Sequence, residues 1–183
     1  MAGLQAGAPT PVSLTVHRQS RVLEMSFSDG AQFRIPFELM RVYSPSAEVQ
    51  GHGPGQQVLQ TGKRDVDLLA LEPVGNYAVQ PVFSDGHNSG IFSWAYLYEL
   101  GSRQDALWAQ YLARLAEGYG LPFQMPSRFP RSGLLAARVA LLGTHEAWMG
   151  DFARAVMRAN FAEDLDIAEP KVIRAILDGL GLP

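Results

Sequence analysis

Residues 21–35 have the sequence RVLEMSFSDGAQFRI, and this stretch decides the fold of the first part of the chain. Polar and apolar side chains alternate on both sides of Asp29-Gly30, as they do in strands that bury one face. Asp-Gly readily adopts the positive φ angles of a tight hairpin turn. We therefore predict an antiparallel hairpin, which the similar alternation over residues 13–18 extends by a strand. Residues 1–12, which include Ala, Gly and Pro, are expected to be disordered.

Downstream of the hairpin the pattern predicts short helices and more strands. Pro36 can open a helical turn over residues 37–42, and the glycine-rich stretch 44–62 is expected to be a long loop. Strands over residues 65–71 and 77–83 should close the sheet. The spacing of apolar residues then becomes that of a helix. One helix is expected from Ile91 to Tyr98, and a second helix is expected to end at Gly118 and Gly120.

The second part of the chain, residues 119–183, has helical periodicity in three segments. The proline-rich stretch 121–130 separates it from residues 13–118 and is the natural domain boundary. We therefore predict an α+β protein: a small antiparallel β-sheet domain with short helices, followed by an all-α helical segment.

Composition excludes several classes of protein. The 183 residues carry a formal net charge of -3 and no run of Lys and Arg that could follow a phosphate backbone, so nucleic acid is not an expected partner. The absence of cysteine excludes disulfides and thiolate metal sites. Neither a signal peptide nor a membrane-spanning stretch is predicted, so we expect a cytoplasmic protein without a membrane partner.

Several motifs of residues 13–115 are those of a known family. They are Ser44-Pro45-Ser46-Ala47-Glu48-Val49, Gly51-His52-Gly53, Gly75-Asn76-Tyr77, Asp85-Gly86-His87 and the stretch from Gly90 to Trp94. Through them this part of the chain resembles the gamma-butyrobetaine hydroxylase-like N-terminal domain family. The resemblance implies a small α+β module without a reaction of its own. Such modules precede the catalytic domain of carnitine-synthesis dioxygenases and are attached to some iron–sulfur scaffold ATPases.

In the dioxygenases, the resemblance implies, this module holds zinc through three cysteines, spaced C-x-C-x-x-C, and one histidine. Those positions correspond here to Ser44, Ser46, Val49 and His87. Serine hydroxyls and a valine cannot replace thiolates in a tetrahedral zinc site. We therefore predict no cofactor and no zinc, and only His52 and His87 remain as weak candidate metal ligands.

Residues 119–183 contain a second set of motifs: Leu121-Pro122-Phe123, Phe129-Pro130, Leu135-Ala136-Ala137-Arg138, Phe152-Ala153-Arg154-Ala155-Val156, Arg158-Ala159 and the stretch from Phe161 to Ile167. Through them this part of the chain resembles the helical subdomain of 2-hydroxychromene-2-carboxylate isomerases, which are related to kappa-class glutathione transferases. The family inserts these helices into a thioredoxin-like sheet, which has no counterpart here. We hypothesise a gene fusion or deletion that joined two reading frames near Gly118.

The candidate binding residues are Arg41, Glu48, His52, Asn76, Tyr77, Asp85 and His87. Histidines in glycine-rich loops beside a carboxylate can bind a small anion or exchange protons near neutral pH. The alternative is structural, because histidines in tight turns often bond only to the backbone. Both interpretations stay open on sequence alone.

The sequence contains no complete catalytic constellation. An iron dioxygenase needs a His-x-Asp/Glu pair, but the histidines are followed at the second position by Gln19, Pro54, Ser89 and Ala147. We therefore expect a noncatalytic binding or accessory module that acts through a protein partner, linked to iron–sulfur or cofactor metabolism by family analogy. The alternative is an incomplete glutathione-dependent isomerase fused to that module. A homodimer through the C-terminal helices is a further expectation.

Overall fold

A computed structural model describes residues 9–51, 53 and 55–182 of the chain. These residues form two compact units, Met1–Gln110 and Tyr111–Pro183, and the division falls within helix α4 (Gln104–Gly118). The predicted division between residues 118 and 119 stays a prediction.

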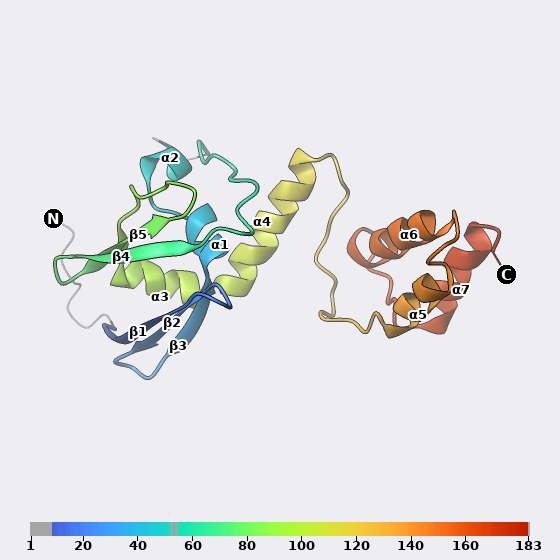
Figure 1. The fold of residues 1–183 in the computed structure, drawn as a ribbon, viewed down its shortest axis with the longest axis horizontal. Helices are drawn as coiled ribbons and strands as arrows, with labels where there is room; N and C mark the ends of the chain where they lie inside the picture. The colour runs from blue at the N-terminus through green and yellow to red at the C-terminus, as the bar shows by residue number, and fades with distance from the viewer. Residues whose placement is uncertain (1–8, 52, 54, 183) are drawn as a thin grey trace. The chain divides into compact units, whose positions relative to one another are not determined.

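Unit 1 begins with an antiparallel sheet of three strands, β1 (Pro11–His17), β2 (Val22–Phe27) and β3 (Gln32–Pro36), in the order β1-β2-β3 (Figure 1). The predicted Asp29-Gly30 turn joins β2 to β3, and Gly30 has a φ of 88°. Pro11 pairs with Phe27, so the strand begins inside the stretch 1–12 that the sequence predicts to be disordered. At Pro11 and Val12 that prediction is wrong, because backbone pairing with β2 orders them.

The second sheet of unit 1 contains β4 (Leu68–Val74), β5 (Ala78–Phe83) and β6 (Phe92–Ser93), in the order β4-β5-β6. The sequence predicts that β4 and β5 close the first sheet, but they belong to a separate one. The strand β4 also continues through Pro73 to Val74, whereas the sequence ends the predicted strand at residue 71. Proline is tolerated there because β4 is an edge strand, where a missing N–H leaves no ladder bond unmade.

Three helices complete unit 1 together with the start of α4: α1 (Phe37–Val42), α2 (Ala47–Gln50) and α3 (Trp94–Ser102). The helix α1 has the predicted bounds, whereas α2 lies in the predicted long loop. Both sheets, α1 and α3 contribute to one core, whose fully buried side chains include Phe37, Phe83, Phe92 and Leu97. The aromatic side chains of Trp94, Tyr96, Tyr98 and Trp108 pack against this core.

Unit 2 contains α5 (Leu134–Leu142), α6 (Met149–Phe161) and α7 (Pro170–Gly179), drawn in orange to red in Figure 1. Their apolar faces form a second core around Phe152, Val156 and Ile173. The predicted α+β class, with sheets and short helices followed by a helical segment, is confirmed. Among the described residues, no helix has the length and hydrophobicity to cross a membrane.

Candidate functional site

Two segments far apart in the sequence bring four predicted site residues together in unit 1. Arg41 comes from α1 and Glu48 from α2, while Asp85 and His87 lie on the turn that follows β5. Gly86, with a φ of 86°, shapes this turn, and the backbone N–H of Phe83 donates to the carbonyl of His87 at 2.9 Å. The turn thereby presents two side chains toward the α1–α2 segment.

Asp85 is the centre of an ion-pair group. Its Oδ2 accepts hydrogen bonds from Arg41 Nε at 2.8 Å and from Lys63 Nζ at 2.6 Å. Arg41 also donates from Nη1 to Gln60 Oε1 at 3.2 Å. The Arg41 side chain is only 8% exposed and the Asp85 side chain 22%, so their charges are partly removed from water. Partial burial strengthens the attraction but makes the loss of either partner costly.

The charges around Asp85 keep it ionised. Burial raises the pKa of its carboxyl, but Lys63, the backbone N–H of His87 and Arg41 outweigh this effect and leave the pKa below its ordinary value. Asp85 is therefore a permanent counter-ion for Arg41 and Lys63 at neutral pH.

His87 links this group to Glu48 and Ser44. Its backbone N–H donates to Asp85 Oδ1 at 3.3 Å, its Nδ1 lies 3.1 Å from Glu48 Oε2, and its Nε2 lies 2.8 Å from Ser44 Oγ. The imidazole is 2% exposed, whereas the Glu48 side chain is 70% exposed. His87 thus connects a surface carboxylate to a fully buried hydroxyl.

The imidazole of His87 is neutral near pH 7. Burial lowers its pKa first, the positive charge of Arg41 lowers it further, and the bond to Glu48 only partly compensates. A neutral ring with a carboxylate at Nδ1 carries its proton there, so Nε2 accepts a hydrogen bond from the Ser44 hydroxyl; this tautomer is assigned from the partners.

The order serine, histidine, acid is that of a catalytic triad, but the surroundings do not allow catalysis by Ser44. A nucleophile must reach a substrate carbonyl, and Ser44 has 0% exposure. A Cβ added to Gly90 would lie 2.2 Å from Ser44 Oγ, so the hydroxyl packs directly against that glycine. The hydrogen bonds of His87 to Ser44 and Glu48 connect the α1–α2 segment to the turn after β5.

The other predicted site residues are placed elsewhere or not described. Asn76 and Tyr77 lie between β4 and β5, where their carbonyls accept hydrogen bonds from the ring and the backbone N–H of Trp94, at 2.8 and 3.0 Å. Within the described part of the chain, the hydrogen bonds of Asn76 and Tyr77 do not reach Arg41, Asp85 or His87. His52 lies outside the described residues. The role of all these residues in binding a ligand or partner stays a prediction.

Several polar residues that interact with the predicted site residues, or with one another in unit 2, are not predicted from the sequence. Lys63 completes the interactions of Asp85 but has no periodicity or motif that marks it as a partner, and Ser44, although it lies in a family motif, is not among the predicted binding residues. In unit 2, the buried Arg131 pairs with Asp164 and donates from Nη1 to Asn160 Oδ1 at 3.2 Å. Asp164 therefore pairs with a buried guanidinium.

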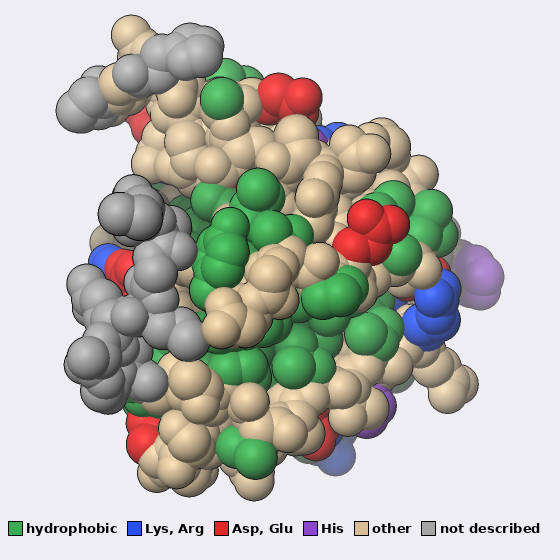
Figure 2. Space-filling model, turned by 90° about the vertical axis from the view of Figure 1, so that its left-hand side faces the viewer, with side chains coloured by type: hydrophobic (Ala, Val, Ile, Leu, Met, Phe, Trp, Pro, Cys, Tyr) green, Lys and Arg blue, Asp and Glu red, His purple; other side chains and the backbone are tan. Residues whose placement is uncertain are grey.

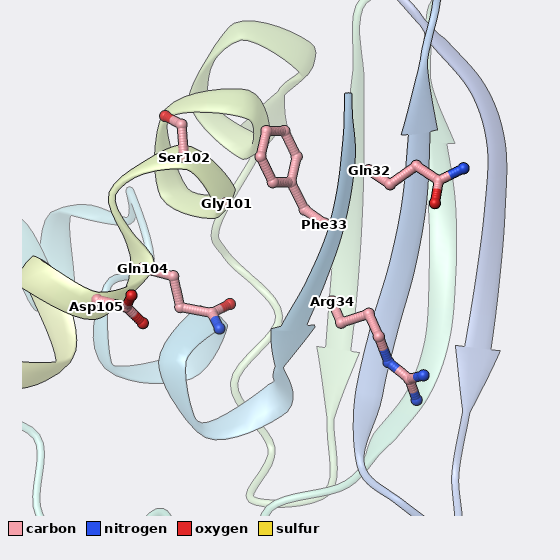
Figure 3. A pocket seen from close by; sticks show the side chains of 7 residues that line it. All are labelled: Gln32, Phe33, Arg34, Gly101, Ser102, Gln104 and Asp105. Carbon is pink, nitrogen blue, oxygen red and sulfur yellow. The ribbon is translucent and has the colours of Figure 1, made fainter. Parts of the chain in front are cut away.

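A shallow groove of about 270 Å³ lies at the edge of β3. It is lined by Gln32, Phe33 and Arg34, and by Gly101, Ser102, Gln104 and Asp105 at the junction of α3 and α4. Figure 3 shows Phe33 pointing toward α3, whereas Gln32 and Arg34 extend from the other side of the strand. None of these residues is a predicted site residue.

Comparisons with known proteins identify the family of this chain. The model of the gamma-butyrobetaine hydroxylase-like N-terminal family matches residues 14–98. A protein with an NMR solution structure is 50% identical over 65% of this chain and 89% of its own, with a TM-score of 0.55. A second NMR structure is 44% identical over 68% and 99%, also with a TM-score of 0.55.

A crystal structure of a protein of unknown function from Acidithiobacillus ferrooxidans, of the DUF971 family, is 41% identical over 50% of this chain and 92% of its own, with a TM-score of 0.43. No curated protein matches the chain. None of these matches supports the resemblance of residues 119–183 to isomerases, which stays a prediction. The family model matches residues 14–98, and a 50% identical relative is covered over 89% of its length. The chain therefore belongs to the gamma-butyrobetaine hydroxylase-like N-terminal family, whose domain it carries over residues 14–98.

Proposed function

We propose that this protein is a noncatalytic accessory module of the cytoplasm that binds a protein partner through the edge strand β1. The observation that carries the proposal is the exposure of β1. Val12 is 70% exposed and Leu14 and Val16 are each 36% exposed. Among the described residues no strand pairs with the outer edge of β1, and residues 11–16 carry no charged side chain.

An edge strand of this kind is a template for strand addition. Soluble proteins protect such edges with charged side chains, proline or a covering segment, because unpaired N–H and C=O groups attract another strand. Here only Pro11 and a register shift between Pro11 and Ser13 interrupt the edge. A partner strand would gain main-chain hydrogen bonds and contacts with the apolar side chains. Figure 2 shows that hydrophobic side chains also gather on one face of the molecule, where few charged groups lie.

The test places a photo-crosslinking amino acid at Val12 of the full chain in its host cells, with the same amino acid at Gln32 as control. Gln32 is exposed on β3, at the opposite edge of the same sheet. We expect a defined adduct from position 12 only. With the purified partner, Val12→Lys should weaken binding at least about tenfold and Gln32→Lys less than about twofold. Equal adducts or equal losses at the two positions would refute the proposal.

The link to iron–sulfur or cofactor metabolism is supported by the family resemblance alone, and the identity of the crosslinked partner tests it. The alternative function, an incomplete glutathione-dependent isomerase, is supported only by the resemblance of residues 119–183. Retention on immobilised glutathione is its test.

We also propose a homodimer through the C-terminal helices. Support comes from large apolar side chains exposed on α5, where Leu134 is 58%, Leu141 73% and Leu142 84% exposed. Light scattering after gel filtration should give twice the chain mass for the wild type and the chain mass for Leu141→Glu/Leu142→Glu. A monomeric wild type at high micromolar concentration would exclude this dimer.

A further inference from the structure

The positions that correspond to the family's zinc ligands are gathered in one buried place in this chain. Ser44, Ser46, Val49 and His87 are 0%, 4%, 3% and 5% exposed. Ser44 Oγ accepts a hydrogen bond from the backbone N–H of Ser46 at 3.4 Å and lies 2.8 Å from His87 Nε2. The backbone N–H of Val49 donates to the carbonyl of Ser46 at 3.1 Å, which fixes the start of α2. The backbone therefore holds these positions against one another.

The side chains present do not fit a zinc ion. Structural zinc takes four ligands among thiolates, imidazoles and carboxylates, and Val49 offers no donor atom. Both ring nitrogens of His87 already have partners, Glu48 and Ser44. Among the described residues, no group of three His, Asp or Glu side chains could hold a metal ion.

Ser46 is buried at this place without a hydrogen bond from any described residue to its hydroxyl. It is the N-cap residue of α2, where a serine ordinarily accepts a hydrogen bond from the first turn, but its side chain makes no capping bond. Its Oγ is instead buried and has no hydrogen-bond partner in the described part of the chain. Such an unpaired buried hydroxyl is destabilising, and it contributes nothing to the capping of α2.

We propose that a hydrogen-bonded cluster has replaced a metal centre here: the Ser44–His87–Glu48 chain of hydrogen bonds holds the α1–α2 segment to the turn after β5 without metal. We infer further that the backbone has kept the ligand arrangement, so that cysteines at positions 44, 46 and 49 would restore a tetrahedral site with His87. This inference does not depend on the proposed partner or on β1.

The experiment compares zinc binding by the tag-free wild type and by Ser44→Cys/Ser46→Cys/Val49→Cys, both as full chains. The wild type should purify with substoichiometric zinc, and its melting temperature should not change with zinc or chelator. The triple variant should bind about one zinc per chain, and its cobalt complex should have the intense visible bands of tetrahedral thiolate coordination. A control with Ser13→Cys/Ser89→Cys/Ser102→Cys, at exposed serines, should bind none with this signature.

Stoichiometric zinc in the wild type would overturn the replacement. A folded triple variant without zinc would overturn the retained arrangement. If the triple variant does not fold, Ser44→Cys/Ser46→Cys offers two thiolates and His87 while keeping Val49 in the core. It should still bind cobalt with tetrahedral bands, and its failure to do so while folded would equally contradict the inference.

Discussion

At the scale of single residues, Gly90 sets how closely the segment that ends at β6 approaches Ser44. A Cβ at this position would lie 2.2 Å from Ser44 Oγ and 3.1 Å from the Phe92 ring, both fully buried. Gly90→Ala should therefore lower the free energy of unfolding by about 1–3 kcal/mol. Chemical denaturation measures this loss. Gly133→Ala, where an added Cβ meets nothing within 4 Å, should change it by less than about 0.5 kcal/mol.

The ion pairs of Asp85 predict a second large effect. Asp85→Asn removes the partner of a guanidinium that is only 8% exposed, and should lower the free energy of unfolding by about 2–4 kcal/mol. Asp178→Asn is the matched control, because Asp178 forms an exposed ion pair with Arg174 within α7. This substitution should lower the free energy of unfolding by less than about 0.5 kcal/mol. Equal losses in the two variants would show that burial adds nothing at Asp85.

His87 predicts how stability depends on pH. Its pKa in the folded protein lies below the ordinary 6.5, so the unfolded chain binds the proton more readily. The stabilisation is therefore complete above about pH 6.5 and declines as the pH falls toward the folded pKa. Urea unfolding between about pH 5 and 7.5 should show this decline in the wild type and in His145→Gln, an exposed control. His87→Gln should be less stable but should show a flatter profile; an unchanged slope would contradict the assignment.

Motifs predict most of the polar residues around Asp85 and His87. Arg41, Glu48, Asp85 and His87 are all named from the sequence, and the structure brings them together. Ser44 enters the sequence analysis only as the residue at a zinc-ligand position of the family. Lys63 follows the predicted loop 44–62, and no pattern marks it as a partner of Asp85. Which distant side chain completes a buried hydrogen bond depends on tertiary packing, which one sequence does not encode locally.

At the scale of elements, two N-cap serines predict opposite outcomes. Ser93 Oγ accepts from the backbone N–H of Tyr96 at 3.2 Å and caps α3, so Ser93→Ala should lower the free energy of unfolding by about 1 kcal/mol. Ser46 occupies the N-cap of α2 without a capping bond, and its hydroxyl is buried. Ser46→Ala should be neutral or stabilising. Thermal and urea unfolding of both variants measure these changes. If Ser46→Ala lowers the free energy of unfolding as much as Ser93→Ala does, the Ser46 hydroxyl has a hydrogen-bond partner.

The sequence predicts correctly those strands and helices whose position depends on neighbouring residues alone. The hairpin at Asp29-Gly30 and the helix after Pro36 depend on adjacent residues and were placed correctly. The second sheet was not separated from the first, because alternation gives the buried face of a strand and not its neighbour. The sequence ends the predicted strand at residue 71, before Pro73, whereas β4 continues to Val74. Only the sheet order shows that β4 is an edge strand, in which proline is tolerated.

At the scale of the whole molecule, the chain contains two hydrophobic cores that share no residue. The core of unit 1 draws its residues from Leu23 to Trp108, and that of unit 2 from Leu135 to Leu177. The family domain of residues 14–98 lies entirely in unit 1. A separate core is the physical requirement for a part of a chain to fold alone.

The last prediction follows from this separation. A fragment of residues 1–118 keeps every residue of the first core, including Leu107 and Trp108 at its margin. It should unfold cooperatively at a temperature within about 2 °C of the corresponding transition of the full chain, which calorimetry measures beside gel filtration of both proteins. A fragment ending at residue 98 is the control, and it should be less stable because it loses Leu100, which is 1% exposed, and those two side chains. If the 1–118 fragment aggregates or melts several degrees lower, the helical segment is part of one cooperative fold, and a recent joining of two independent modules near Gly118 becomes untenable.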